Sequence, residues 1–326
     1  MALAALALVH AGASAQGAQR FIYSPYKHLA MWQDGSRAVT LADGRYIVDG
    51  KRRIGPGALT WAFATGECGD EKWGEVPGQQ IADANVAAFD QAGVEYLVST
   101  GGQGGVFTCA SDEGMERFIK RYQSARLIGL DFDIEAGQTE AQVDSLIQRI
   151  KTAQARRPQL RYSFTVATHA GSDGRMQSLN RQGEMILAAI RRHGLQGYTM
   201  NLMVMDYGPG ARRTCVLNRR GDCDMGKSAL QAARNVHAKY NIPYEQIELT
   251  AMIGVNDVVS NVFTAADARL LARESRTMKL AGLHYWSLDR DTPCTKRTRG
   301  ASPTCSTLAL PKGEYNKLMG ASHRPQ

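Results

Sequence analysis

The sequence predicts an α/β fold, a (β/α)8 or TIM barrel in a single domain, and three observations support this prediction. Eight short apolar runs rich in β-forming residues alternate with longer segments of helical periodicity. This alternation is typical of parallel strands joined by right-handed crossovers, and eight such units can close into a barrel. No linker, internal repeat or low-complexity tract divides the 326 residues. A doubly wound open sheet is the alternative, but the glycine-rich phosphate turn that usually follows its first strand is missing.

The element boundaries follow from periodicity and from turn residues. The expected strands cover residues 20–30, 58–64, 94–100, 127–134, 162–167, 199–205, 247–253 and 283–288. The expected helices cover residues 81–92, 113–123, 140–156, 179–192, 227–240, 265–280 and 310–319. Thr139 and Thr264 precede two of these helices and are suited to cap them. Residues 32–56 are rich in Asp, Gly and Arg, which favours a hairpin or loop over a helix there.

The N-terminal segment has features of an export signal. Residues 2–9 form a short apolar run, and Ala13-Ser14-Ala15 fits the small-x-small cleavage rule. We therefore expect a signal peptide over residues 1–15 and a mature barrel domain over residues 16–326. The basic residues that usually begin a signal are missing, so an Ala-rich terminal segment without this role is the alternative.

Six cysteines, an even number, support export. Six cysteines allow 15 pairings, and proximity in the chain favours Cys215–Cys223 and Cys294–Cys305, which leaves Cys68–Cys109. Disulfides indicate a secreted or periplasmic protein. Zinc is the alternative use of these residues, but no Cys-x-x-Cys pair or matching histidine spacing accompanies them, so we expect no metal.

The charge and hydropathy of the chain limit the classes of binding partner that we expect. The net charge is +8, but Lys and Arg are scattered and no nucleic-acid-binding motif accompanies them. No apolar run approaches the ~20 residues that a membrane-spanning helix needs. We expect no nucleic acid partner and no membrane span, and we take a monomer as the default state.

An acidic motif closes the fourth strand. Asp131, Asp133 and Glu135 alternate with apolar residues, so the three carboxyl groups share one face of the strand. The opposite face would pack under the helices with Leu130, Phe132 and Ile134. Three carboxylates this close cannot all ionise, so at least one pKa must rise, which suits a general acid. A calcium or magnesium site and a solvated edge strand are the alternatives, and the apolar opposite face disfavours both.

The motif Gly129-x-Asp-x-Asp-x-Glu135 resembles the signature of family 18 glycoside hydrolases, the chitinases. Ser99-Thr100-Gly101-Gly102 is similar to the motif that ends the third strand in this family. The stretch from Asn201 to Gly208, with Met203, Asp206 and Tyr207, is similar to the family's sixth-strand motif, and Trp286 matches the tryptophan at the end of the eighth strand. The resemblance spans about residues 20–290, with the motifs in the expected order. One departure is Ile128, which stands where the full signature has an aspartate.

The resemblance implies a mechanism. Glu135 would protonate the glycosidic oxygen, and the N-acetyl oxygen of the substrate would attack the anomeric carbon, the substrate-assisted exception among retaining glycosidases. Asp133 would orient the acetamido group, and Asp131 would share a proton with Asp133. No metal or organic cofactor is implied.

The resemblance also implies how the substrate is bound. Tyr207 would hydrogen-bond the acetamido oxygen, and Asp206 would line the same pocket. Trp286 would form the floor beneath the sugar. Further contacts are expected from Met203, Ser99 and Tyr26, of which Tyr26 would reach the sugar from the end of the first strand.

The predicted function is retaining hydrolysis of β-1,4-linked N-acetylglucosamine polymers, with chitin or its oligosaccharides as the partner. A chitin- or glycan-binding protein without catalysis, favoured only by Ile128, and an endo-β-N-acetylglucosaminidase are the alternatives. His28 and His169 are expected to be loop or packing residues. Trp32, Trp61 and Trp73 could either extend a sugar-binding cleft or fill the core.

Overall fold

The computed structural model describes residues 20–31, 35–41, 44–50, 52–53, 56–135 and 137–321. The expected signal peptide, residues 1–15, lies outside the described residues, and so does Trp32. Within them, no helix has both the length and the apolar content to cross a membrane.

The sheet closes on itself. Its strand order is β1-β17-β14-β13-β12-β11-β9-β5-β2, and all its neighbours are parallel. The end strands β1 (Ile22–Tyr23) and β2 (Tyr26–His28) are separated in the chain only by Ser24 and Pro25. They are two halves of one strand, of which β1 pairs with β17 and β2 with β5. The predicted eight-stranded barrel is therefore confirmed, with its first strand interrupted.

The other barrel strands agree with the expected ranges to within two residues at each end. They are β5 (Ala58–Ala64), β9 (Glu95–Gly101), β11 (Leu127–Asp133), β12 (Arg161–Ala167), β13 (Thr199–Met203), β14 (Ile247–Met252) and β17 (Gly282–Trp286). Each is followed by loops on the same face of the barrel, because parallel strands end at one edge of the sheet.

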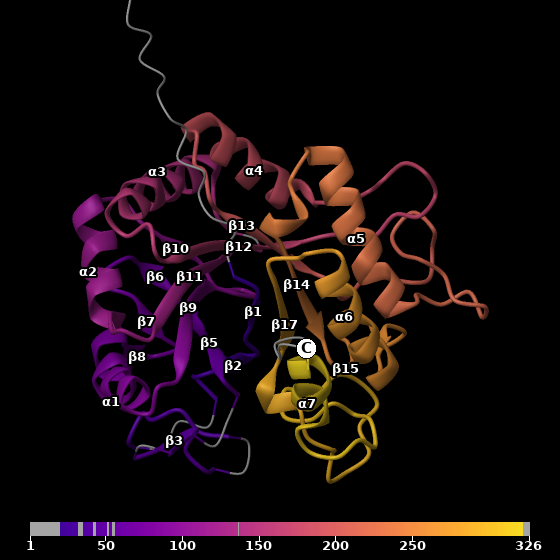
Figure 1. Cartoon of the computed structure of the whole chain (residues 1–326), viewed down its shortest axis with the longest axis horizontal. Helices are drawn as coiled ribbons and strands as arrows, with labels where there is room; N and C mark the ends of the chain where they lie inside the picture. The colour runs from indigo at the N-terminus through magenta and orange to yellow at the C-terminus, as the bar shows by residue number, and fades with distance from the viewer. Residues whose placement is uncertain are drawn as a thin grey trace, which may run out of the picture.

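Seven helices surround the described part of the barrel (Figure 1). They are α1 (Gly78–Gln91), α2 (Asp112–Tyr122), α3 (Glu140–Arg156), α4 (Arg181–His193), α5 (Met225–Tyr240), α6 (Ala265–Thr277) and α7 (Glu314–Gly320). Thr139 and Thr264 cap α3 and α6 as predicted, each through a reciprocal capping box.

Among the described residues, several two-residue strands and two 3-10 helices lie in the segments between the barrel strands and the helices. Strands β3 (Val48–Asp49) and β4 (Arg52–Arg53) form the hairpin expected within residues 32–56. The other short pairs are β6 (Gly66–Glu67) with β10 (Phe107–Thr108), β7 (Lys72–Trp73) with β8 (Val76–Pro77), and β15 (Gly254–Val255) with β16 (Val262–Phe263). Two 3-10 helices are η1 (Tyr244–Gln246) and η2 (Leu288–Arg290).

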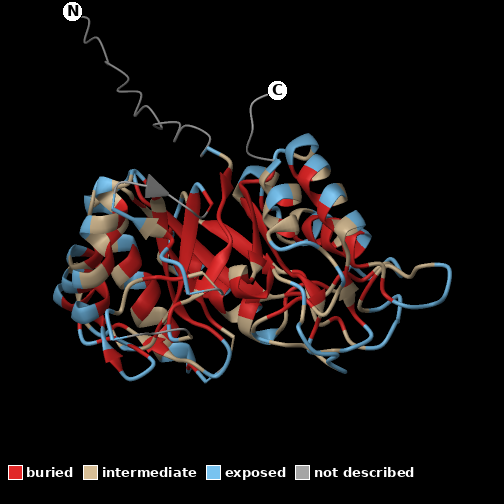
Figure 2. Ribbon diagram, turned by 90° about the horizontal axis from the view of Figure 1, so that it is seen from below, coloured by how far each residue is buried: buried red, intermediate tan, exposed pale blue. Residues whose placement is uncertain are grey.

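The main core lies between the strands and the helices, where the buried strands sit inside helices with exposed outer faces (Figure 2). Phe132 on β11 stacks on Phe164 of β12, with ring centroids 5.7 Å apart. Trp61 is fully buried and stacks on Tyr96 at 4.4 Å, and Trp73 is fully buried as well. Both tryptophans therefore fill the core and do not extend a cleft.

All three predicted disulfides are present: Cys68–Cys109, Cys215–Cys223 and Cys294–Cys305. In the described part of the chain, the one cluster with the residue types of a metal site is Glu67, Cys68 and Cys109. The two sulfur atoms of this cluster are bonded to each other, which rules out thiolate ligation there.

Candidate active site

A cavity of about 330 Å³ opens at the carboxyl ends of the barrel strands. Strands β2, β5, β11, β12, β13, β14 and β17, or the residues just after them, contribute to its wall. Six of the residues predicted from the sequence line it: Tyr26, Asp133, Glu135, Met203, Asp206 and Trp286. Residues up to 260 positions apart in the chain, Tyr26 and Trp286, thus meet at the position where active sites of this barrel class lie.

Asp131 is the deepest acid of the motif and both its oxygens are engaged. Its Oδ2 accepts hydrogen bonds from Ser99 Oγ at 2.6 Å and Tyr26 Oη at 2.8 Å, and its Oδ1 accepts one from Thr165 Oγ1 at 2.7 Å. Burial raises the pKa of Asp131, although the three hydroxyl groups act to lower it. The carboxyl group is therefore fixed in one orientation beneath the cavity.

A second row of polar side chains holds this arrangement from the side. Asn201 on β13 donates from Nδ2 to Tyr26 Oη at 2.9 Å and to Thr165 Oγ1 at 2.8 Å, and its Oδ1 accepts from Thr250 Oγ1 at 2.8 Å. The network joins β2, β11, β12, β13 and β14 across the barrel. Buried networks that are satisfied in this way rigidify a site. Sequence reasoning missed Thr165 and Thr250, whose only signal is polarity on otherwise apolar strands.

Asp133 and Glu135 differ from Asp131 in having few partners. Asp133 is buried, lines the cavity, and its Oδ1 has no hydrogen-bond partner in the described structure. Burial raises the pKa of Asp133 well above its ordinary value, and the charges of Glu135 and Asp131 raise it further. Glu135 is half-buried, and burial together with Asp206 and Asp257 raises its pKa. Both groups are thereby biased toward the protonated state, as a proton donor requires.

Asp206 is held by the loop that follows β14. Its Oδ1 accepts a hydrogen bond from Val258 N at 2.7 Å, and its own N donates to Asn256 Oδ1 at 3.4 Å. The backbone of Asp206 has a φ of +50°, a left-handed conformation that costs energy outside glycine and persists where the surroundings impose it. Asp257 lies in the same loop and lines the cavity, and sequence reasoning missed it.

An aromatic wall lies beside the acids. Trp286, at the end of β17, is half-buried and stacks on Phe63 of β5, with centroids 5.4 Å apart and planes 17° from parallel. The Tyr26 ring lies 6.3 Å from Trp286. Sequence reasoning missed Phe63, because nothing in an apolar strand marks which ring faces the cavity. A wide aromatic surface of this kind suits the apolar face of a sugar ring.

Two predicted contact residues lie away from the cavity wall. Ser99 is fully buried and donates a hydrogen bond to the Asp131 carboxylate. Tyr207 is buried and its hydroxyl has no partner among the described residues, while Met205, two positions earlier, lines the cavity. His169 also lines the cavity, and its Nδ1 has no partner in the described structure. Of these, only Met205 and His169 could touch a ligand as the chain stands.

Ile128 occupies an irregular part of β11. The pairing of β11 with β9 shifts register between Leu127 and Gly129, on either side of this residue. A Cβ at Gly129 would lie 2.8 Å from the Arg161 Cβ and 2.9 Å from the Arg161 carbonyl oxygen, so the close approach of β11 and β12 favours glycine at this strand position. Ile128 is half-buried at this bulge, five residues before Asp133, the nearest acid of the motif that lines the cavity.

Comparisons with known proteins find chitinases. No protein-family model matches the chain. The probable bifunctional chitinase/lysozyme of Escherichia coli strain K12 is 26% identical over 236 residues, which are 68% of this chain and 26% of that protein. Endochitinase 11 of Metarhizium anisopliae is 26% identical over 253 residues, which are 72% of this chain and 48% of that protein. The chain thus spans about a quarter and about half of the length of these two curated relatives.

Solved structures show the same fold. Active domain 2 of the thermostable chitinase from Pyrococcus furiosus, solved as catalytic-site mutants with chito-oligosaccharides, matches over 94% of this chain and 95% of that chain. The TM-score is 0.70 and the sequence identity 24%. The chitinase ChiW from a Paenibacillus strain matches over 93% of this chain and 43% of that chain, with a TM-score of 0.51 and 12% identity. The chain is therefore similar in sequence to these chitinases and shares the barrel fold of the Pyrococcus furiosus domain.

Proposed function

We propose that this protein is a retaining glycoside hydrolase that cleaves β-1,4-linked N-acetylglucosamine polymers by a substrate-assisted route. The observation that carries the proposal is the pair formed by Asp133 and Glu135 in the cavity, both with a raised pKa and with the Asp133 Oδ1 free to bind a ligand. The relatives named above are chitinases, which supports the same substrate class.

The first step is cleavage. Glu135, protonated, gives its proton to the glycosidic oxygen while the acetamido oxygen of the same substrate attacks the anomeric carbon. The bond to the leaving sugar breaks, and a cyclic oxazolinium ion forms on the substrate. Asp133 holds the acetamido N–H and stabilises the positive charge that develops on the ring, so its carboxylate form is favoured as the reaction proceeds.

The second step restores the enzyme. Glu135, now ionised, takes a proton from a water molecule, which attacks the anomeric carbon and opens the oxazolinium ion. Two displacements at one carbon retain its configuration. Asp131 acts through Asp133, because its charge raises the pKa of that residue and its own position is fixed by three hydroxyl groups.

We assign the orientation of the substrate to two groups of residues: the aromatic wall, and the end of β13 with the residues just after it. Trp286, backed by Phe63, forms the platform beneath the sugar that reacts. Asp206 and Met203 line the acetamido side of the cavity. Tyr207 stays a proposed ligand of the acetamido oxygen only if its buried side chain turns into the cavity when substrate binds.

A protein that only bound glycans would not need Asp131, Asp133 and Glu135 together, with the cost of burying them. We therefore rank hydrolysis above binding alone, although Ile128 departs from the family signature. The three disulfides support an exported protein, and a monomer is the state we propose for the barrel.

The test is incubation of the purified protein with N-acetylglucosamine oligosaccharides, with products followed by mass spectrometry. Glu135→Gln is the control, because it keeps the shape of the side chain and removes the proton donor. Shorter oligomers from the wild type alone would support the proposal. Equal cleavage by both proteins would refute the role of Glu135, and binding without cleavage by both would favour a glycan-binding protein.

A further inference from the structure

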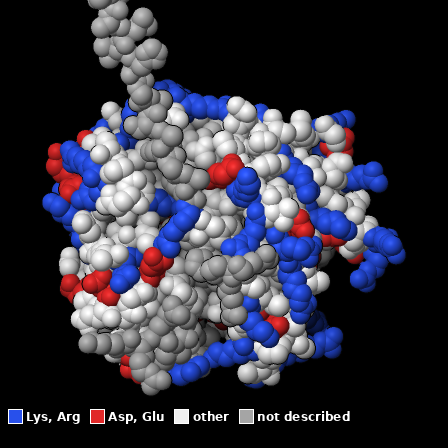
Figure 3. All heavy atoms as spheres, in the orientation of Figure 1, with Lys and Arg blue, Asp and Glu red and all other residues white. Residues whose placement is uncertain are grey.

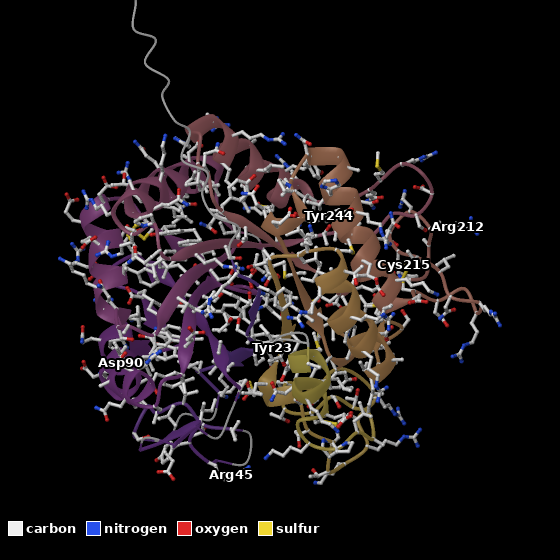
Figure 4. All side chains as sticks on the ribbon, viewed as in Figure 1. Tyr23, Arg45, Asp90, Arg212, Cys215 and Tyr244 are labelled. Carbon is white, nitrogen blue, oxygen red and sulfur yellow. A yellow bond between two sulfur atoms is a disulfide. The ribbon has the colours of Figure 1, made fainter. Side chains whose placement is uncertain are left out.

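A basic loop leads from β13 to α5. We call residues 208–224 the arginine loop, because they hold four arginines, Arg212, Arg213, Arg219 and Arg220, and two aspartates. All four arginines are exposed. Arg212 points outward past α5 in Figure 4, and basic side chains cover much of this side of the molecule in Figure 3. None of the four side chains makes a hydrogen bond or ion pair with another described residue.

The loop is rigidly built in spite of its exposure. Cys215–Cys223 closes its outer half, and Asp224 N donates to Val216 O at 2.8 Å across the same span. At the tip, Asn218 N donates to Asp222 O at 2.8 Å and Gly221 N to Asn218 O at 3.1 Å. These bonds place Arg219 and Arg220 at the two central positions of a turn. A rigid scaffold that presents unpaired cations loses little entropy on binding.

The base of the loop adjoins the cavity. Ala170 N donates to Thr214 O at 2.8 Å, and Ser172 N donates to Arg212 O at 2.7 Å. Ala170 follows His169, which lines the cavity. Burial lowers the pKa of His169, and the charge of Arg213 lowers it further, so this arginine acts on the cavity wall. A polymer that leaves the cavity past His169 would therefore meet the base of the arginine loop.

We propose that the arginine loop binds the acidic groups of a polysaccharide whose N-acetylglucosamine residues occupy the active-site cavity. This inference rests on the proposed function, since the loop would act on the same polymer. An arginine fork matches a carboxylate with two parallel hydrogen bonds. The preferred substrate would then be an N-acetylglucosamine polymer that carries carboxylates at intervals, with neutral chitin as a poorer one.

The charge inside the cavity selects this partner over a nucleic acid. Asp133, Glu135, Asp206 and Asp257 all line the cavity, and whichever of these carboxyl groups are ionised would repel a chain with a negative charge on every unit. A polysaccharide with neutral units in the cavity and acidic groups outside it meets both surfaces favourably. The acidic cavity and the basic loop together are complementary to such a mixed polymer.

The experiment measures equilibrium binding of two soluble chitin derivatives, acidic carboxymethyl chitin and neutral glycol chitin, to the full chain. The parent protein carries Glu135→Gln so that neither polymer is cleaved during titration. The loop variant adds Arg219→Ala and Arg220→Ala. The matched control adds Arg234→Ala and Arg269→Ala, which remove two exposed arginines from the helices α5 and α6, away from the cavity wall.

We expect the loop variant to bind carboxymethyl chitin roughly three- to tenfold more weakly than the parent, from the loss of two exposed ion pairs. The difference should shrink as salt rises. Glycol chitin should bind equally to all three proteins, and the control should match the parent on both polymers. In the background with Glu135 intact, the loop variant should cleave neutral oligosaccharides as the wild type does.

Three results would overturn the inference. The loop variant could bind carboxymethyl chitin as tightly as the parent, or the control could lose as much, which would show a general effect of net charge. The loop variant could also lose affinity for duplex DNA and none for carboxymethyl chitin, which would assign the loop to nucleic acid. Failure of the proposed function is seen separately, as absence of neutral oligosaccharide cleavage by the wild type.

Discussion

Glu248 and Arg161 form a buried ion pair inside the barrel, and its removal is the sharpest structural prediction. Glu248 on β14 pairs with Arg161 of β12, accepts a hydrogen bond from Ser163 Oγ at 2.8 Å, and lies 3.6 Å from His284 Nε2. Burial alone would raise the pKa of Glu248, but Arg161, His284 and Ser163 outweigh it and lower the pKa from 4.5 to about 2. We predict that Glu248→Gln destabilises the protein strongly.

The magnitude follows from that pKa. A carboxyl group whose pKa falls on folding adds stability above its unfolded pKa and loses it as the pH falls through the folded pKa. The interval from 4.5 to about 2 is worth ~3 kcal/mol, because a tenfold change in proton affinity is worth ~1.4 kcal/mol. Breaking a buried pair on one side costs a similar ~3–5 kcal/mol, because the partner charge stays buried. We therefore expect Glu248→Gln to lower the unfolding free energy by ~3 kcal/mol at neutral pH.

The assay is urea unfolding followed by near-ultraviolet circular dichroism, at neutral pH and at points between pH 4.5 and about 2. The difference between wild type and Glu248→Gln should be full at neutral pH and shrink through this interval. Glu184→Gln is the control, since Glu184 pairs with Lys239 at 3.1 Å on the surface, where such pairs are worth less than about 1 kcal/mol. A loss as small as that of the control, or a difference that did not depend on pH, would refute the reasoning.

Three further predictions concern the cavity and the disulfides. Asp133→Asn should lower kcat on N-acetylglucosamine oligosaccharides by roughly 10²- to 10⁴-fold, the usual range for a positioned acid–base group; a mild effect would argue against substrate assistance. Asp257→Asn removes a negative charge that raises the pKa of Glu135, so the alkaline limb of the kcat–pH profile should move to lower pH, and an unmoved limb would contradict this coupling. Alkylation followed by mass spectrometry should label no thiols before reduction and six after it, and labelling of the unreduced protein would count against the disulfides.

The barrel could be predicted because its signals are local. Strand β11 alternates acidic and apolar residues, and a period of two assigns each side chain to one face without knowledge of the neighbours. Leu130 and Phe132 are fully buried on the helix side, as expected. The break of the first strand at Ser24 and Pro25 could not be predicted, because β1 and β2 pair with different strands, β17 and β5, and pairing partners are a property of the closed sheet.

The site was predictable only in part, for a related reason. Asp133, Glu135 and Trp286 carry motifs, and the structure brings them to one cavity. Phe63 and Asp257 carry none, because their place at the cavity depends on how β5 and the loop after β14 meet the other strands. Tyr207 belongs to a recognised motif, yet its side chain does not line the cavity. Its motif could be read, but the neighbouring Asp206 takes a left-handed backbone conformation that a sequence pattern does not reveal.

The buried acidic residues of this barrel differ in the partners of their carboxyl groups, and these differences explain why their pKa values shift in different directions. Glu248 is neutralised by Arg161, so its charge is stabilised and its pKa falls. Asp131 has only hydroxyl partners, so burial prevails and its pKa rises. Asp133 has an oxygen with no partner among the described residues, and its pKa rises furthest above the ordinary value. The charge of Glu248 raises the pKa of Asp131, and the charge of Asp131 raises the pKa of Asp133. The groups at the cavity are thus left with protons they can exchange, and a substrate that brings its own positive charge in the transition state supplies the partner that Asp133 lacks.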